Sequence, residues 1–129
     1  MSKTNFFIQS AIDLLDRADY LNSASRAYYA VYHVMRDKLE MEGVKSKLSH
    51  KAVHNSYGDI VCKTSSDRSA LLSELQRWQR VREDVDYSRG VDTSLRYEKQ
   101  LIKGINDMVS FAQQNSSGGV VRPKSMNIF

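Results

Sequence analysis

The sequence predicts an all-α protein, folded as an antiparallel four-helix bundle with one additional short helix. The 129 residues contain one proline and six glycines, so long stretches run without a helix breaker. Those stretches are rich in Leu, Ala, Arg, Glu, Gln and Met, which lose little freedom in a helix, and their apolar residues recur at three- and four-residue spacing. A chain of this length forms one core. We assign residues 1–114 to the bundle and residues 115–129 to a C-terminal tail.

The first helix is predicted to begin at an N-cap, Thr4 or Asn5, and to end around Tyr20. Either cap side chain can accept a hydrogen bond from the free amides of the first turn. The small and apolar residues that follow at helical spacing are Phe7, Ile8, Ala11, Leu14, Leu15 and Ala18. They predict the buried face of this helix.

The second helix is predicted to begin behind an N-cap at Asn22 or Ser23 and to run to Glu42, where Gly43 can end it. Steps of 100° per residue divide this helix into two faces. One face is a core stripe of Ala24, Ala27, Tyr28, Val31, Val34, Met35 and Leu39. The other face carries Arg26, Tyr29, Ala30, His33, Arg36 and Asp37.

Tyr29 and His33 lie four residues apart on this second face. One reading makes them ordinary surface residues, because single exposed rings are common. The other makes them, together with Arg26, part of a face for a nucleic acid or a second subunit. The small side chain of Ala30 between them would let another helix approach closely, which favours a homodimer over an open pocket.

Three further helices are predicted in the second half of the chain: a short one through Ile60, a long one reaching about Asp86, and a last one through Phe111. Their predicted N-caps are Ser49, then Ser66 or Asp67, then Asp92 or Thr93. Gly118 and Gly119 form a hinge within the tail. Its apolar end is expected either to fray or to dock in extended form on the dimer or on a partner.

Arg82 falls on the apolar stripe of the long fourth helix, among Leu71, Leu75, Trp78 and Val85. A guanidinium directed at a core is costly unless it is paired. Asp86 follows four residues later, at the distance where helical side chains meet. Arg82 and Asp86 therefore form either a structural ion pair at the edge of the bundle or a functional group held in a groove.

Composition limits the classes of partner and cofactor. The net charge is +4, with a pI near 9.2, which fits RNA or DNA as a partner but also an ordinary solvated surface. The chain has no Gly-rich phosphate loop, and His50 and His54 lack a third ligand at suitable spacing. We therefore predict no cofactor and no metal.

The expected location is the cytoplasm. The first ten residues show neither a cationic leader nor a cleavage site. No apolar run approaches the roughly 18 residues that a membrane span needs. Cys62 is the only cysteine, so no internal disulfide is expected.

Two motifs resemble those of the HEPN domain superfamily, in particular its small prokaryotic members. They are "SRAYYAVYH" at residues 25–33 and "RVREDVDY" at residues 80–87, and "LSHKAV" at residues 48–53 is similar to the start of the family's short helix. The resemblance implies a helical bundle that forms a homodimer and acts on RNA in toxin–antitoxin or antiphage defence systems. Many such proteins are metal-independent endoribonucleases, in which an arginine is followed four to six residues later by a histidine.

Arg82 matches the arginine of this motif, but no histidine follows His54 in the chain. RNA cleavage needs groups that exchange protons near neutral pH, which an arginine does not do. Asp86, Tyr87 or His33 are the residues that could replace the missing histidine, and we take Arg82, Asp86 and Tyr87 as the candidate catalytic set. Whether the chain is an enzyme therefore stays open.

The resemblance also implies a second role for Tyr87. Some toxins of the superfamily pair with a nucleotidyltransferase that modifies a tyrosine at a similar offset from the arginine, so Tyr87 is a candidate modification site. Three classes of function remain: an RNA-directed effector, a non-catalytic binding or regulatory module, and a partner or substrate of a nucleotidyltransferase.

Overall fold

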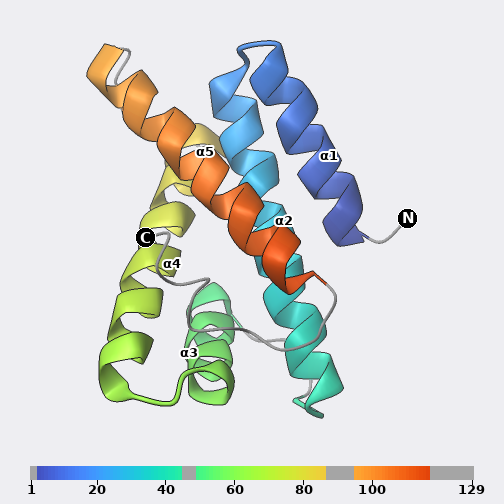
Figure 1. Cartoon of the computed structure of the whole chain (residues 1–129), viewed down its shortest axis with the longest axis vertical. Helices are drawn as coiled ribbons and strands as arrows, with labels where there is room; N and C mark the ends of the chain where they lie inside the picture. The colour runs from blue at the N-terminus through green and yellow to red at the C-terminus, as the bar shows by residue number, and fades with distance from the viewer. Residues whose placement is uncertain (1–2, 45–48, 87–94, 117–129) are drawn as a thin grey trace.

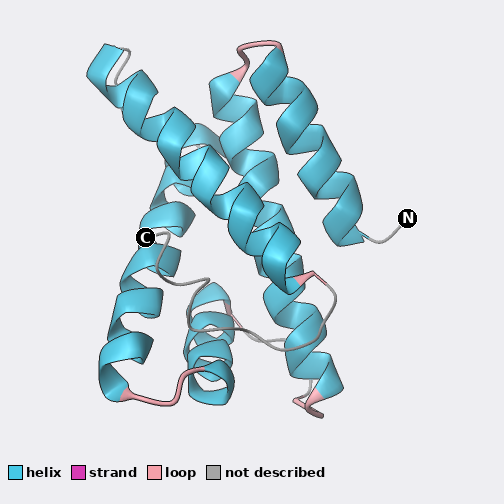
Figure 2. Cartoon of the chain, viewed as in Figure 1, coloured by secondary structure: helices cyan, strands magenta, loops and turns pink. Residues whose placement is uncertain are grey.

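The computed structural model describes residues 3–44, 49–86 and 95–116, and for residues 84–86 and 95–97 it describes the backbone only. The described residues form five α-helices and contain no strand (Figure 1; Figure 2). The helices are α1 (Lys3–Asp16), α2 (Tyr20–Met41), α3 (His50–Val61), α4 (Ser65–Asp86) and α5 (Leu95–Asn115). The prediction of an all-α protein is therefore confirmed.

α1 and α2 lie antiparallel, side by side, and a tight turn joins them (Figure 1). The predicted caps of α1, Thr4 and Asn5, lie inside the helix, which already includes Lys3. The helix also ends earlier than predicted, at Asp16. In the turn that follows, Ala18 has a φ of 60°, a left-handed conformation that cannot continue a helix.

Asp19 is the N-cap of α2, so the predicted caps Asn22 and Ser23 are wrong. The carboxylate of Asp19 accepts hydrogen bonds from the backbone amide of Asn22 at 3.4 Å and from its side-chain amide at 2.9 Å. Ser23 has a different task. Its hydroxyl donates a 2.7 Å hydrogen bond to the carbonyl of Ala11 in α1 and so ties the two helices together.

α2 is the central helix, because it packs against each of the other four (Figure 1). Its predicted core stripe is confirmed, since every member is buried: Ala24, Ala27, Tyr28, Val31, Val34, Met35 and Leu39. Its predicted end is confirmed as well. The helix stops at Met41, Glu42 is the C-cap, and Gly43 takes the φ of 79° that a glycine adopts without strain.

The N-caps of α3 and α4 are both hydroxyl side chains. The Ser49 hydroxyl accepts a hydrogen bond from the Ala52 amide at 3.1 Å, as predicted. The Thr64 hydroxyl accepts one from the Asp67 amide at 3.1 Å. The predicted cap of α4 at Ser66 or Asp67 is therefore wrong by a few residues, because both lie in the first helical turn.

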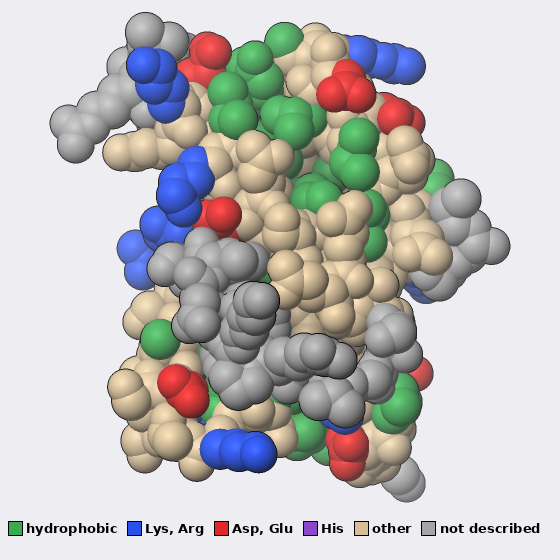
Figure 3. Space-filling model, viewed as in Figure 1, with side chains coloured by type: hydrophobic (Ala, Val, Ile, Leu, Met, Phe, Trp, Pro, Cys, Tyr) green, Lys and Arg blue, Asp and Glu red, His purple; other side chains and the backbone are tan. Residues whose placement is uncertain are grey.

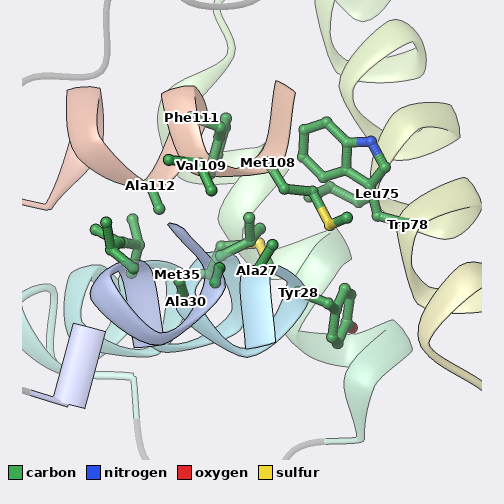
Figure 4. Packing of buried hydrophobic residues seen from close by; sticks show 14 of the residues in the cluster. Ala27, Tyr28, Ala30, Met35, Leu75, Trp78, Met108, Val109, Phe111 and Ala112 are labelled. Atoms are coloured by element: carbon green, nitrogen blue, oxygen red, sulfur yellow. The ribbon is translucent and has the colours of Figure 1, made fainter. Parts of the chain in front are cut away.

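Aromatic rings join the outer helices to one another. Trp78 of α4 lies with its ring centroid 5.8 Å from that of Phe111 in α5, and Tyr57 of α3 lies 6.1 Å from the same ring. Figure 4 shows Leu75 and Trp78 reaching from α4 towards Met108 of α5, with Tyr28 at one end of the labelled cluster. The core therefore runs across all the helices that surround α2.

Figure 3 shows one face of the molecule, on which apolar side chains gather near the end where α1 turns into α2. Among the residues that the structure describes, no helix has both the length and the apolar character to cross a membrane. The predicted caps Asp92 and Thr93, Tyr87 and the proposed docking of the tail all lie outside the described residues.

Candidate functional site

One polar cluster joins three helices beside the apolar core. We call it the Tyr28 cluster, and it consists of Tyr28 from α2, His50 and His54 from α3, and Arg82 from α4. Tyr28, His54 and Arg82 are buried, at 0%, 1% and 6% exposure, and His50 is half-buried. The cluster thus has a closed inner part and an outer end at His50.

The first turn of α3 places the two histidines. Because Ser49 is the N-cap, the helix begins at His50, and His54 stands one turn later on the same face. That face lies against the rings of α2. The centroid of the His50 ring is 4.5 Å from that of Tyr32 and 5.7 Å from that of Tyr28.

The hydroxyl of Tyr28 lies between the two histidines, 2.8 Å from Nδ1 of His50 and 3.1 Å from Nε2 of His54. A phenol has a single proton to donate. Nδ1 of His54 is buried with no hydrogen-bond partner among the described residues, so a proton there would be an unsatisfied donor. With its proton on Nε2, His54 donates to Tyr28, which then donates to Nδ1 of His50; in the opposite direction His50 donates to Tyr28 and Tyr28 to His54, which leaves Nε2 of His50 free to accept a proton.

All three hydrogen-bonded groups are neutral at pH 7. Burial, together with His50, lowers the pKa of His54 from 6.5 to about 4. Burial and the charge of Arg82 also lower the pKa of His50, while Glu83 opposes this shift. Burial raises the pKa of Tyr28 above its usual value of 10.0, although Arg82 acts in the other direction. Arg82 is thus the charged member of the cluster.

Arg82 lies on the buried face of α4, as the sequence predicts. Its Cζ atom is 5.6 Å from the ring centroid of Tyr28 and 5.8 Å from that of Tyr29. Contacts of this kind favour a guanidinium over an aromatic face. The structure describes the backbone but not the side chain of Asp86, and Tyr87 lies outside the described residues, so the predicted Arg82–Asp86 ion pair stays a prediction.

A hollow of about 270 Å³ opens beside His54, between α3 and α4. Its lining is polar, and half of the lining residues are charged: Lys51, His54, Gln76, Gln79, Arg80 and Glu83. The buried histidine therefore borders a surface that carries both signs of charge.

The second face of α2 is partly covered by α1, while Arg26 and Asp37 on it are exposed. Phe7 of α1 stacks on His33, with 5.3 Å between the ring centroids and 6° between the planes, and lies 5.6 Å from Tyr29. Ala30 is fully buried within the chain. Ala30 therefore offers no surface to a second subunit, while the assignment of Arg26, Tyr29 and His33 to a nucleic-acid or dimer face stays a prediction.

Arg26 alone of the three predicted face residues is exposed. Tyr29 is half-buried between Phe7 and Arg82. His33 is half-buried on Phe7, and burial lowers its pKa. The structure thus brings Tyr29 to Arg82 and packs His33 against α1.

His50 and His54 are the site residues that sequence reasoning missed. The two histidines lie four residues apart just after the Ser49 N-cap. On sequence alone this spacing indicates only a metal site that lacks a third ligand. Their contact with Tyr28 spans 22 and 26 residues of sequence, and no local pattern encodes it. Among the described residues, no group of three His, Cys, Asp or Glu side chains could hold a metal ion.

Fold and site together define a class: an all-α protein with a tyrosine–histidine–arginine cluster between its central helix and two outer ones. No protein-family model matches the chain, and a search of curated proteins also finds no match.

Proposed function

We propose that this chain is an RNA-directed effector of the HEPN type, folded as that superfamily's four-helix bundle with an added short helix, and that it cleaves RNA without a metal ion. The observation that carries the proposal is the placement of His50 and Arg82 around Tyr28. A histidine is what the motif around Arg82 lacks, and α3 supplies one from another part of the chain.

His50 is the proposed general base. It is neutral at pH 7, since burial and Arg82 lower its pKa, and it is half-buried, whereas His54 is closed off. In the proposed reaction, His50 donates from Nδ1 to Tyr28, and its free Nε2 takes the proton of the ribose 2′-hydroxyl, whose oxygen attacks the phosphorus atom. The bond to the 5′-oxygen breaks and that oxygen takes a proton from water. The product is a cyclic phosphate.

Arg82 is proposed to stabilise the negative charge that grows on the phosphate oxygens. A guanidinium binds phosphate in a planar, two-pronged manner and stays charged at any working pH. Its Cζ atom lies 5.6 Å from the ring centroid of Tyr28 and 5.8 Å from that of Tyr29. Asp86 and Tyr87, the other two residues of the predicted catalytic set, follow Arg82 in the chain and stay candidates on the resemblance alone.

A second candidate function is a non-catalytic binding or regulatory module. The burial of Arg82, at 6% exposure, favours it, because a charge so enclosed can serve to hold α4 against α2. The resemblance further suggests a homodimer, a prokaryotic defence or toxin–antitoxin role in the cytoplasm, and a partner such as a nucleotidyltransferase acting on Tyr87.

RNA cleavage in EDTA distinguishes the two candidates. We expect wild-type protein to cleave labelled RNA, and His50→Asn to cut the rate by about 100-fold or more, since an amide can hydrogen-bond Tyr28 but cannot exchange protons. Arg82→Ala should cause a loss of about 100-fold or more. The matched control is Arg77→Ala, which removes an exposed arginine of the same helix.

Circular dichroism of each variant separates lost chemistry from lost folding, and His50→Asn keeps the test valid if Arg82→Ala unfolds. Equal cleavage by wild type and His50→Asn would rule out the assigned site. If the wild type binds RNA without cleaving it, the result contradicts the nuclease and supports the second candidate function, a non-catalytic binding module.

A further inference from the structure

A second hollow, of about 280 Å³, lies between α1 and α2. We call it the α1–α2 hollow, and its lining residues are Phe7, Asn22, Ser25, Arg26 and Tyr29. Four of the five come from α2 at spacings of three and four, so they form one stripe along that helix. Phe7 of α1 closes the opposite side. The hollow therefore has a wall on each of two helices that are tied together.

The lining combines aromatic rings with polar groups and one cation. Phe7 and Tyr29 supply ring surface, the Asn22 amide carries a donor and an acceptor, and Arg26 is exposed. None of the described lining residues is acidic. The hollow beside His54, in contrast, contains Glu83, and one between α4 and α5 is mostly apolar around Trp78 and Met108. Of these three, the α1–α2 hollow best suits a flat ligand with polar edges that is joined to an anion.

Tyr29 connects this hollow to the Tyr28 cluster. Its ring lines the hollow, and its centroid is 5.8 Å from Cζ of Arg82. Phe7, 5.6 Å away, holds the ring from the side of α1. A ligand in the hollow is thus separated from Arg82 by the width of one aromatic ring.

We propose that the α1–α2 hollow binds an unpaired nucleobase of single-stranded RNA, next to the nucleotide whose phosphate meets Arg82. This inference rests on the proposed function, because it names the substrate class of the same site. The base lies against Phe7 and Tyr29, and Arg26 contacts the backbone phosphate, while the Asn22 amide, which donates to Asp19, forms part of the wall. A base paired in a duplex cannot enter, so the site selects single strands.

Binding measurements test the hollow without relying on cleavage. The probe is a fluorescein-labelled single-stranded RNA of about 12 nucleotides, with 2′-O-methyl riboses that cannot be cleaved, compared with its duplex by anisotropy. Asn22→Trp fills the hollow and should weaken single-strand binding by about tenfold, the scale of one lost base contact. Asn22→Ala leaves the hollow open and loses the same bond to Asp19, so it is the matched control and should lose much less.

Arg26→Ala tests the phosphate contact. It should lower the slope of log affinity against log salt by about one unit, whereas Arg17→Ala, at an exposed position in the α1–α2 turn, should leave the slope unchanged. Wild type should prefer the single strand over the duplex, and Asn22→Trp should lose that preference.

Each result separates this inference from the proposed function. Unchanged affinity in Asn22→Trp, with cleavage by the wild type, overturns the base site and leaves the nuclease. Weakened binding in Asn22→Trp, without cleavage by the wild type, supports the base site and overturns the nuclease. A wild type that binds neither form of RNA overturns both.

Discussion

Tyr28 contributes both an apolar ring and a hydrogen-bonding hydroxyl to the core. Its ring is fully buried among the apolar residues of α2, and its hydroxyl joins two histidines of α3. A Phe would fill nearly the same volume and leave both histidines without this contact. Sequence periodicity predicted the buried ring correctly, but not the polar contacts, because those depend on how α3 packs.

Protonation of His54 should make the fold sensitive to mild acid. Its pKa is about 4 in the folded chain and near 6.5 in an unfolded one, so the unfolded state binds the extra proton between these values. The stability contributed by neutral His54 is complete above about pH 6.5 and is lost as the pH falls towards 4, by up to about 1.4 kcal/mol per pH unit. Urea unfolding between pH 7 and pH 5 measures this slope.

The control is His54→Gln, which cannot be protonated and should show a shallower slope. The comparison matters because His50 and His33 also have lowered pKa values. Lys51, Arg80 and Glu83 line the same hollow as His54. Equal slopes in wild type and variant would contradict the prediction, because they would mean that folding does not lower the pKa of His54.

At the scale of helices, the way in which α1 covers α2 explains the main error of the sequence analysis. A helical wheel sorts the residues of one helix by direction, and it assigned Tyr29, Ala30 and His33 to an open face. That face is a second packing surface, because Phe7 and the Ser23–Ala11 hydrogen bond bring α1 onto it. The residues of a central helix can be buried on more than one side, and a wheel for that helix alone cannot show it.

The start of α2 was misplaced for a related reason. Asp19, Asn22 and Ser23 can all cap a helix, and the choice depends on where the chain turns. The left-handed Ala18 makes that turn just before Asp19. We expect Asp19→Ala to lower the free energy of unfolding by about 1 kcal/mol, because the first turn of α2 loses its acceptor.

Asp19→Asn is the matched control, since asparagine caps helices about as well as aspartate. Thermal or urea unfolding followed by circular dichroism compares the two variants. A loss of equal size in both would show that the negative charge, and not the hydrogen bond, stabilises the start of α2.

At the scale of the whole molecule, the homodimer stays a prediction that rests on the resemblance. Light scattering should give twice the chain mass of 14.8 kDa. Leu21, 37% exposed, stands in the first turn of α2. Leu21→Glu is expected to favour the monomer, because a charge at an apolar contact is costly.

Met41→Glu is the matched control, because Met41 is 65% exposed at the opposite end of α2. Wild-type monomers at every concentration would contradict the dimer. Dissociation by Met41→Glu and not by Leu21→Glu would place the contact at the other end of the molecule.

Trp78 gives the molecule an internal optical reporter. It is the only tryptophan in the chain, it is 1% exposed, and its ring meets Phe111 across the contact between α4 and α5 (Figure 4). Its fluorescence emission therefore follows the water content of that contact, shifting to longer wavelength when the two helices separate. The α1–α2 hollow and the Tyr28 cluster are built from other residues, so variants at either place can be compared through the emission wavelength at an intact core.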